Sequence, residues 1–124
     1  MVGGFSQGGI TAGAFAQDFS GTFQIQQVVT IGAPIGKFDI PTKVHLLAYE
    51  ASDDPVPRLE GASNPTSPNW QTVTGDDGGG MPGSHNPIDY ANVAANGTQP
   101  DDPSTLSQFF NEGGKQVYDY YATK

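Results

Sequence analysis

The stretch Gly4-Phe5-Ser6-Gln7-Gly8 decides the fold expected of this sequence, because it fits a serine held on a sharp turn in front of a helix. On such a turn the serine backbone is strained, and bulky side chains two positions away would collide with it. Apolar and small residues then recur at helical spacing as far as about Phe19, and Ser20-Gly21 is typical of a helix end. The sequence therefore predicts a helix from Gln7 to about Phe19, with Ser6 on the turn before it.

Ser6 is a candidate nucleophile, with one plain alternative. In a chain with 17 glycines the pattern Gly-x-Ser-x-Gly also arises by chance, and Ser6 would then only cap a helix after a glycine-rich turn. The periodic helix that begins directly after the serine favours the first interpretation. In that case the backbone N–H of Gln7 lies at the helix N-terminus, where it can face a developing oxyanion.

Strands and a second helix are expected after this first helix. Residues 27–31 and 43–49 are short, apolar and bounded by turn residues, which is typical of buried strands. Residues 70–74 predict a third, shorter strand. After polar and glycine-rich loops, the apolar residues within 105–121 fit a C-terminal amphipathic helix. This succession predicts an α/β fold in a single domain that covers residues 1–124.

A hydrolytic serine needs an imidazole to accept its proton and a carboxylate to orient the imidazole. The chain has two histidines. His45 lies inside a predicted strand, where a structural role is the plain interpretation, whereas His85 follows the third strand on a loop. Asp53 and Asp54 follow the second strand, and the prolines after Asp54 stiffen its loop. Taken singly, His85 and Asp54 are also explained as solvated loop residues. The chain order Ser6, Asp54, His85 favours a catalytic triad.

Composition and charge exclude several classes of protein. Five basic against thirteen acidic residues give a net charge of −8 at pH 7, which excludes the basic stripe that nucleic-acid binding requires and argues against binding to anionic membranes. The chain has no Cys, and therefore no disulfide, thiolate metal site or thiol nucleophile. No run approaches the length of a transmembrane segment, and no secretory signal is expected here. The localisation of the protein, including a secreted parent, is left open.

These motifs resemble those of α/β-hydrolase-fold serine hydrolases, and more narrowly those of a set of actinobacterial hydrolases with cutinase-like and lipase-like features. The matching elements are the serine turn, the strand that ends in Gly32-Ala33-Pro34, and the run Asp54-Pro55-Val56-Pro57-Arg58-Leu59. Asn64-Pro65, Pro68-Asn69-Trp70, His85 and the later Tyr90 continue the pattern, so the resemblance covers nearly the whole chain. It implies Ser6 as nucleophile, Asp54 as acid and His85 as base, with no metal and no cofactor.

The sequence departs from that pattern in two places. The crossover 33–42 is too short for the usual helix, which leaves open whether the strands on either side are parallel. Residues 1–9 are too glycine-rich for an ordinary strand, and Met1-Val2-Gly3 cannot supply the strand that should precede Ser6. The loop that carries the second oxyanion donor in the family would also lie upstream. We therefore expect a partial hydrolase sheet that starts at the serine turn, with about three further strands and flanking helices, whose missing N-terminal half is a partner.

The complete protein is expected to hydrolyse a small-molecule or lipid ester, or a thioester, through an acyl-serine intermediate. This chain by itself is expected to be inactive. Two other interpretations stay open. One is a non-catalytic α/β binding or assembly module that retains the serine turn as architecture. The other is a calcium-binding surface, although the spacing of its acidic residues matches no EF-hand loop; these residues are Asp53, Asp54, Asp76, Asp77 and Asp89.

Overall fold

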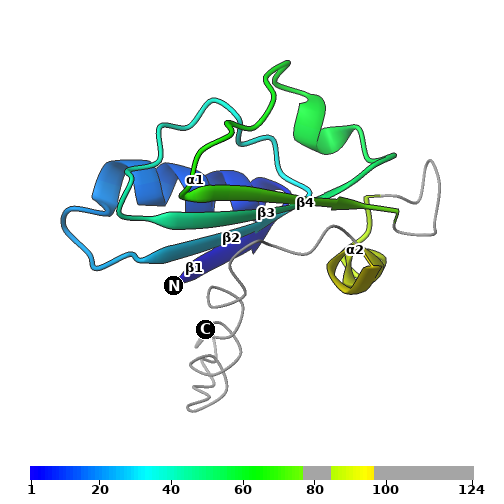
Figure 1. Cartoon of the computed structure of the whole chain (residues 1–124), viewed down its shortest axis with the longest axis horizontal. Coiled ribbons are helices and arrows are strands. Elements are labelled where there is room, and N and C mark those ends of the chain that lie inside the picture. The colour runs from blue at the N-terminus through cyan, green and yellow to red at the C-terminus, as the bar shows by residue number, and fades with distance from the viewer. Residues whose placement is uncertain (77–84, 97–124) are drawn as a thin grey trace, which may run out of the picture.

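The computed structural model describes residues 1–76 and 85–96. Within these residues four strands form one parallel sheet, in the order β1-β2-β3-β4, which is also their order along the chain. One helix lies on each face of the sheet (Figure 1). The predicted α/β class is therefore confirmed. The elements are β1 Val2–Phe5, α1 Gln7–Phe19, β2 Gln27–Ile31, β3 His45–Ala51, the 3₁₀ turn η1 Val56–Arg58, β4 Trp70–Gly75 and α2 Tyr90–Asn96.

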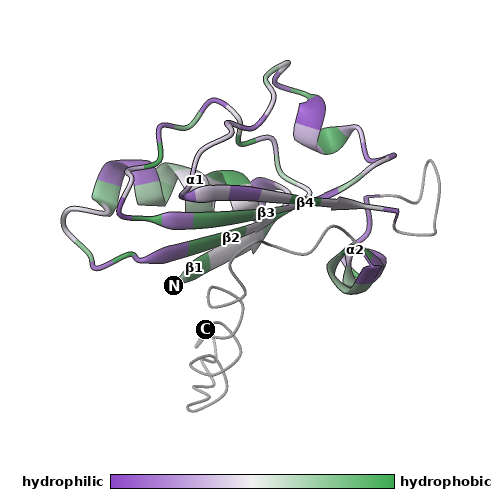
Figure 2. Ribbon diagram, in the orientation of Figure 1, coloured by the Kyte–Doolittle hydropathy of each residue, from purple (hydrophilic) through white to green (hydrophobic). Residues whose placement is uncertain are grey.

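Both faces of the sheet are buried, which is why the strands read as nearly continuous apolar runs. Successive side chains of a strand point to opposite faces, so Val28 and Leu46 join the core on the α1 side while Val29 and Leu47 join the core on the α2 side. Figure 2 shows hydrophobic stretches along β2 and β3, the strands with a neighbour on each side. Each such side chain contributes about 1.5–3 kcal/mol by its burial, so these two cores hold the helices to the sheet.

The segment before Ser6 forms a strand, and the prediction that it could not is wrong. Val2–Phe5 pairs with β2 in parallel register, from Val2 opposite Val28 to Phe5 opposite Ile31. The backbone N–H of Ser6 extends this ladder by donating to the carbonyl of Ile31, with an N···O distance of 2.8 Å. The intrinsic preference of glycine against the strand conformation is weak compared with the stabilisation that the segment gains by pairing with a buried strand. The ladder with β2 therefore determines the conformation of this glycine-rich segment.

The short crossover between β2 and β3 joins two parallel strands without a helix. The register runs from Gln27 opposite His45 to Ile31 opposite Tyr49, which settles the pairing direction left open by the sequence. In place of a helix, the connecting segment inserts the buried side chains of Ile35 and Ile40 into the core on the α1 side. A loop that buries its own apolar residues thus covers this part of the sheet.

The other predicted elements differ in smaller ways. The first helix is found with its predicted bounds, whereas β3 begins and ends two residues later than expected and β4 extends to Gly75. The helix α2 was not predicted, because only two of its seven residues, Tyr90 and Val93, are buried and the apolar pattern is correspondingly weak. The C-terminal helix expected over 105–121 lies outside the described residues.

The two glycines that flank Ser6 in the motif differ in what surrounds them, and this yields a stability prediction. A Cβ atom at Gly4 would lie 2.2 Å from the backbone carbon and oxygen of Gly8 and 2.6 Å from the nitrogen of Gly9, whereas a Cβ at Gly8 would meet nothing within 4 Å. The expectation that both glycines are required for space is therefore wrong for Gly8.

Gly4→Ala should accordingly destabilise the chain by about 3 kcal/mol or more, because the strand and the helix start must separate. Gly8→Ala should instead raise the free energy of unfolding by up to about 1 kcal/mol, since alanine has the better helix propensity. Urea unfolding of both variants and the parent chain measures the difference. Equal effects of the two substitutions would contradict the close approach of β1 and α1 at Gly4.

Candidate active site

Ser6 joins β1 to α1 in a backbone conformation that is rare for a residue with a side chain. Its φ is 53° and its ψ is −119°, and it is the one non-glycine residue with a positive φ in the described part of the chain. Such a conformation costs about 1–3 kcal/mol and persists only where the surroundings enforce it. Here the Ser6 N–H donates to Ile31, and the Ser6 carbonyl accepts from the N–H groups of Gly9 and Ile10. The backbone is thus fixed on both sides of the strained residue.

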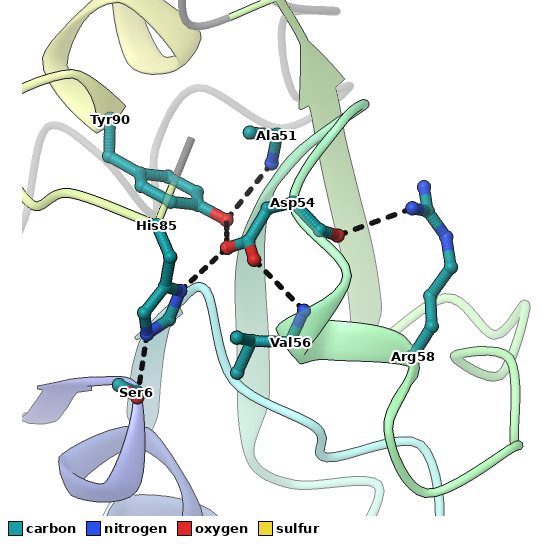
Figure 3. A network of polar contacts seen from close by, with 7 residues as sticks. All are labelled: Ser6, Ala51, Asp54, Val56, Arg58, His85 and Tyr90. Atoms are coloured by element: carbon teal, nitrogen blue, oxygen red, sulfur yellow. Dashed lines mark hydrogen bonds and ion pairs between the residues drawn. The ribbon is translucent and has the colours of Figure 1, made fainter. Parts of the chain in front are cut away.

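The hydroxyl of Ser6 does not cap the helix that it precedes. It contacts the imidazole of His85 instead, with 2.8 Å between Oγ and Nε2 (Figure 3). The other ring nitrogen, Nδ1, lies 2.8 Å from Oδ2 of Asp54. The ring of Phe5 stacks on the imidazole at a centroid distance of 4.8 Å and an interplanar angle of 26°. Three neighbours therefore fix the position and the plane of the imidazole.

Asp54 is fully buried, and each of its carboxylate oxygens accepts hydrogen bonds. Oδ1 accepts from the backbone N–H of Val56 at 2.9 Å, while Oδ2 accepts from Tyr90 and faces His85. A buried carboxylate without such partners would be strongly destabilising, so the loop that carries it has to be held in place. Arg58 contributes to this by donating from Nη1 to the backbone carbonyls of Ser52 and Asp54 at 3.3 Å.

Tyr90 closes the network from the first residue of α2. Its hydroxyl accepts from the backbone N–H of Ala51 at 3.1 Å and donates to Oδ2 of Asp54 at 2.5 Å. Burial, reinforced by the carboxylate of Asp54, holds the pKa of the Tyr90 phenol far above its ordinary range. Tyr90 therefore keeps its proton at any physiological pH and acts as a donor.

Gly32, directly after β2, leaves the space in which these groups meet. Its φ is +57°, a conformation that glycine adopts readily. A Cβ atom here would lie 3.0 Å from the Tyr90 hydroxyl and 3.2 Å from Oδ2 of Asp54. The Gly-Ala-Pro that follows the strand thus begins with a glycine because a side chain would press on the carboxylate.

The structure brings three of the residues selected from the sequence together and places His45 elsewhere. Ser6, Asp54 and His85 come together, and the carboxylate in contact with the imidazole belongs to Asp54 rather than Asp53. His45 is the first residue of β3, exposed at the amino end of the strand, while Ser6 follows the carboxyl end of β1. Gln7 is the first residue of α1, so its backbone N–H is among those that have no partner inside the helix.

Two residues of the network were not assigned a role from the sequence. Phe5 lies next to the serine, and an aromatic residue at the end of a strand that precedes a candidate nucleophile is a usable signal for packing around the base. Tyr90 was noted only as part of the family pattern. Its hydroxyl contact depends on how α2 packs against β3, which no local pattern encodes.

The aspartates considered as calcium ligands do not form a metal site within the described residues. Across residues 1–76 and 85–96, no group of three or more His, Asp or Glu side chains lies close enough to hold a metal ion. Asp77 lies outside the described residues. Among those that are described, no helix has the length and apolar character needed to cross a membrane.

A hollow of about 890 Å³ lies between the crossover 57–68 and the strands β3 and β4, and Arg58 belongs both to its wall and to the network around Asp54. Glu50 and Trp70 line it, and none of Ser6, Asp54 and His85 does. The Glu50 carboxylate accepts a hydrogen bond from Nδ2 of Asn64 at 2.6 Å. Glu50, which follows Tyr49 on β3, is therefore engaged with this loop and not with the imidazole.

Comparisons of the chain with models of protein families, with curated proteins and with solved structures give no match. A function therefore has to be argued from the arrangement of the side chains.

Glu50 should make the stability of the chain depend on pH. Burial raises the pKa of its carboxyl, although the hydrogen bond from Asn64 and the charge of Arg58 act in the opposite direction. A carboxyl with a raised folded-state pKa binds its proton more tightly in the folded than in the unfolded chain. Its stabilising contribution is therefore complete below the unfolded pKa, near pH 4.5, and is lost as the pH rises through the folded value.

Glu50→Gln removes this titration while keeping a carbonyl that can accept from Asn64. The variant should resemble the parent chain at acidic pH and become the more stable of the two as the pH approaches 7. Urea unfolding of both chains at several pH values between about 4 and 7 measures the difference. A difference in unfolding free energy that stays constant with pH would contradict this account.

Proposed function

We propose that this chain carries the catalytic apparatus of a serine hydrolase of the α/β-hydrolase type, which cleaves ester or thioester bonds through an acyl-serine intermediate. The observation that carries the proposal is the continuous contact of Ser6, His85 and Asp54, with 2.8 Å at both junctions. The triad geometry requires such contacts between nucleophile and base and between base and carboxylate.

The contact with Asp54 selects the tautomer of His85. A carboxylate can only accept, so the imidazole carries its proton on Nδ1 and presents the lone pair of Nε2 to the hydroxyl of Ser6. As Oγ attacks the carbonyl carbon of the substrate, Nε2 takes the hydroxyl proton. The imidazolium that forms is stabilised by the buried carboxylate, and the carbonyl oxygen becomes an oxyanion.

The oxyanion develops at the N-terminus of α1. There the backbone N–H of Gln7 supplies one donor, and the helix dipole adds a favourable field. When the tetrahedral intermediate collapses, the bond from carbon to the leaving oxygen or sulfur breaks, and Nε2 returns its proton to the leaving group. Water then attacks the acyl-serine with His85 again as base, releasing the acid and restoring Ser6. These steps use Ser6, His85, Asp54, the backbone N–H of Gln7 and one water molecule.

The strained backbone of Ser6 supports this proposal over a simple capping role. A capping serine adopts an unstrained conformation, and its oxygen accepts from the helix N–H groups. Ser6 does neither, and its Oγ faces an imidazole. Strain of this kind is concentrated at active sites, where it aims a reactive group.

One reason for expecting the chain by itself to be inactive no longer applies, because Val2–Phe5 supplies the strand before Ser6. Gln7 is the oxyanion donor assigned here. Because p-nitrophenolate is a good leaving group, a p-nitrophenyl ester acylates an activated serine readily, and we expect acylation to be faster than turnover.

Mixing the chain with p-nitrophenyl acetate should release a burst of p-nitrophenol that approaches about one equivalent per chain, followed by slower turnover. Ser6→Ala should abolish the burst, and His85→Ala should slow it by roughly 10³-fold or more, because members of a triad act as a unit. His45→Ala is the matched control and should leave the burst unchanged. Stopped-flow absorbance measures its size and rate.

Asp54→Asn should slow the burst by roughly 10²- to 10⁴-fold, because an amide can stabilise the wrong imidazole tautomer, whereas Asp53→Asn should change it little. A burst that is lost in His45→Ala but kept in His85→Ala would show that His45, and not His85, is the base. Full activity of both aspartate variants would remove Asp54 from the mechanism and direct attention to Glu50.

A further inference from the structure

We propose that Tyr90 is a positioning residue of this site, which acts through Asp54 to set how strongly His85 holds a proton; the kinetic part of this inference rests on the proposed function. Tyr90 touches neither the serine nor the imidazole through its hydroxyl. Its hydroxyl binds the same carboxylate oxygen, Oδ2, that faces Nδ1 of His85. Two donors therefore converge on one oxygen.

The direction of the tyrosine hydrogen bond is fixed by its second partner. The backbone N–H of Ala51 donates to the hydroxyl oxygen, so the single hydroxyl hydrogen is left for Asp54. Tyr90 is 2% exposed, and its ring meets Phe5 edge to face at a centroid distance of 6.1 Å. The ring is thereby held with its hydroxyl on the carboxylate, as Figure 3 shows.

Because Tyr90 and His85 share Oδ2 of Asp54, the tyrosine weakens the effect of the carboxylate on the imidazole. A hydrogen bond from Tyr90 draws negative charge away from the side of Asp54 that faces His85, so the carboxylate stabilises the imidazolium less strongly. Without the phenol hydrogen bond the full charge of Oδ2 would act on the imidazole, and His85 would hold its proton to a higher pH. The tyrosine thus keeps the base free to accept a proton from Ser6 at lower pH.

Within residues 1–76 and 85–96, the other groups that contact the pair do not take over this function. The imidazole otherwise meets the hydroxyl of Ser6 and the ring of Phe5, and the carboxylate otherwise accepts from the Val56 N–H. Among the charged side chains of the described residues, Glu50 acts on the Tyr90 phenol, and Arg58 and Glu60 act in turn on Glu50. Arg58 donates to the backbone carbonyl of Asp54 and not to its carboxylate, as Figure 3 shows, and Glu50 accepts from Asn64.

The test compares the proton titration of His85 in the 124-residue chain and in Tyr90→Phe, which keeps the ring and removes the hydroxyl. The chain has two histidines, so NMR follows both imidazole Hε1 signals in one sample. The His85 midpoint should move to higher pH by roughly half a unit or more in Tyr90→Phe, while the exposed His45 serves as internal reference and should not move. Tyr49→Phe, in the same buried cluster, should leave both midpoints where they were.

An unchanged His85 midpoint in a folded Tyr90→Phe chain would overturn the inference and assign the tyrosine a space-filling role. If Tyr90→Phe does not fold, because the carboxylate and the Ala51 N–H each lose a partner, the chain can be produced with 3-fluorotyrosine in place of tyrosine. Fluorination makes the phenol a stronger donor and leaves its atoms in place. The His85 midpoint should then move to lower pH, and an unchanged midpoint would again overturn the proposal.

A kinetic measurement separates this inference from the proposed function. If the serine reacts with p-nitrophenyl acetate, the acidic limb of the burst rate against pH should move to higher pH in Tyr90→Phe together with the NMR midpoint. A shift of half a unit lowers the rate on that limb by roughly threefold, and a larger shift lowers it more. A limb that stays in place while the rate falls would contradict the inference. If neither chain reacts but the His85 midpoint moves, the proposed function fails and the coupling through Asp54 stands.

Discussion

The buried carboxylate of Asp54 is the constraint on which the rest of this arrangement depends. A fully buried charge is tolerated only where donors surround it, and its donors come from three separate parts of the chain: the loop after β3, the loop before α2, and α2 itself. Satisfying this one group therefore fixes the loop after β3, the start of α2 and the plane of the imidazole together. Removing any one donor leaves the buried carboxylate with fewer hydrogen bonds to offset its burial.

The parallel sheet explains why these groups can meet at all. The carboxyl ends of parallel strands lie along one edge of the sheet, which is where ligands bind in open α/β sheets. Ser6 follows β1, Gly32 follows β2 and Asp54 follows β3 at that edge. The strained turn at Ser6 is held there by the backbone ladder to β2, so strand pairing supplies the energy that the serine conformation costs.

Sequence reasoning recovered the parts of this arrangement that local pattern encodes. The helical period after Ser6 defined α1, and β-branched runs defined β2 and β3, because both signals come from one-sided or two-sided burial. Positions after predicted strands made His85 and the pair Asp53 and Asp54 candidates for one site, and the choice of Asp54 rested on the resemblance to the hydrolase pattern. The strand β1 was missed because glycine has little strand preference, and its pairing with β2 is a tertiary effect. Tyr90 was missed as a functional group for the same reason, since its hydroxyl meets Asp54 only after α2 has packed.

If the triad operates as proposed, the fold activates Ser6 among the serines of the chain. Incubation with a fluorophosphonate followed by tandem mass spectrometry tests this most directly, because the reagent phosphonylates serines that an adjacent base has activated, and the peptide spectrum locates the adduct. The folded chain should form a single adduct on Ser6, and the urea-unfolded chain should form none. A folded chain that takes up no label, or that carries it on other serines, would show that Ser6 is not activated and would favour a non-catalytic module that retains the serine turn as architecture.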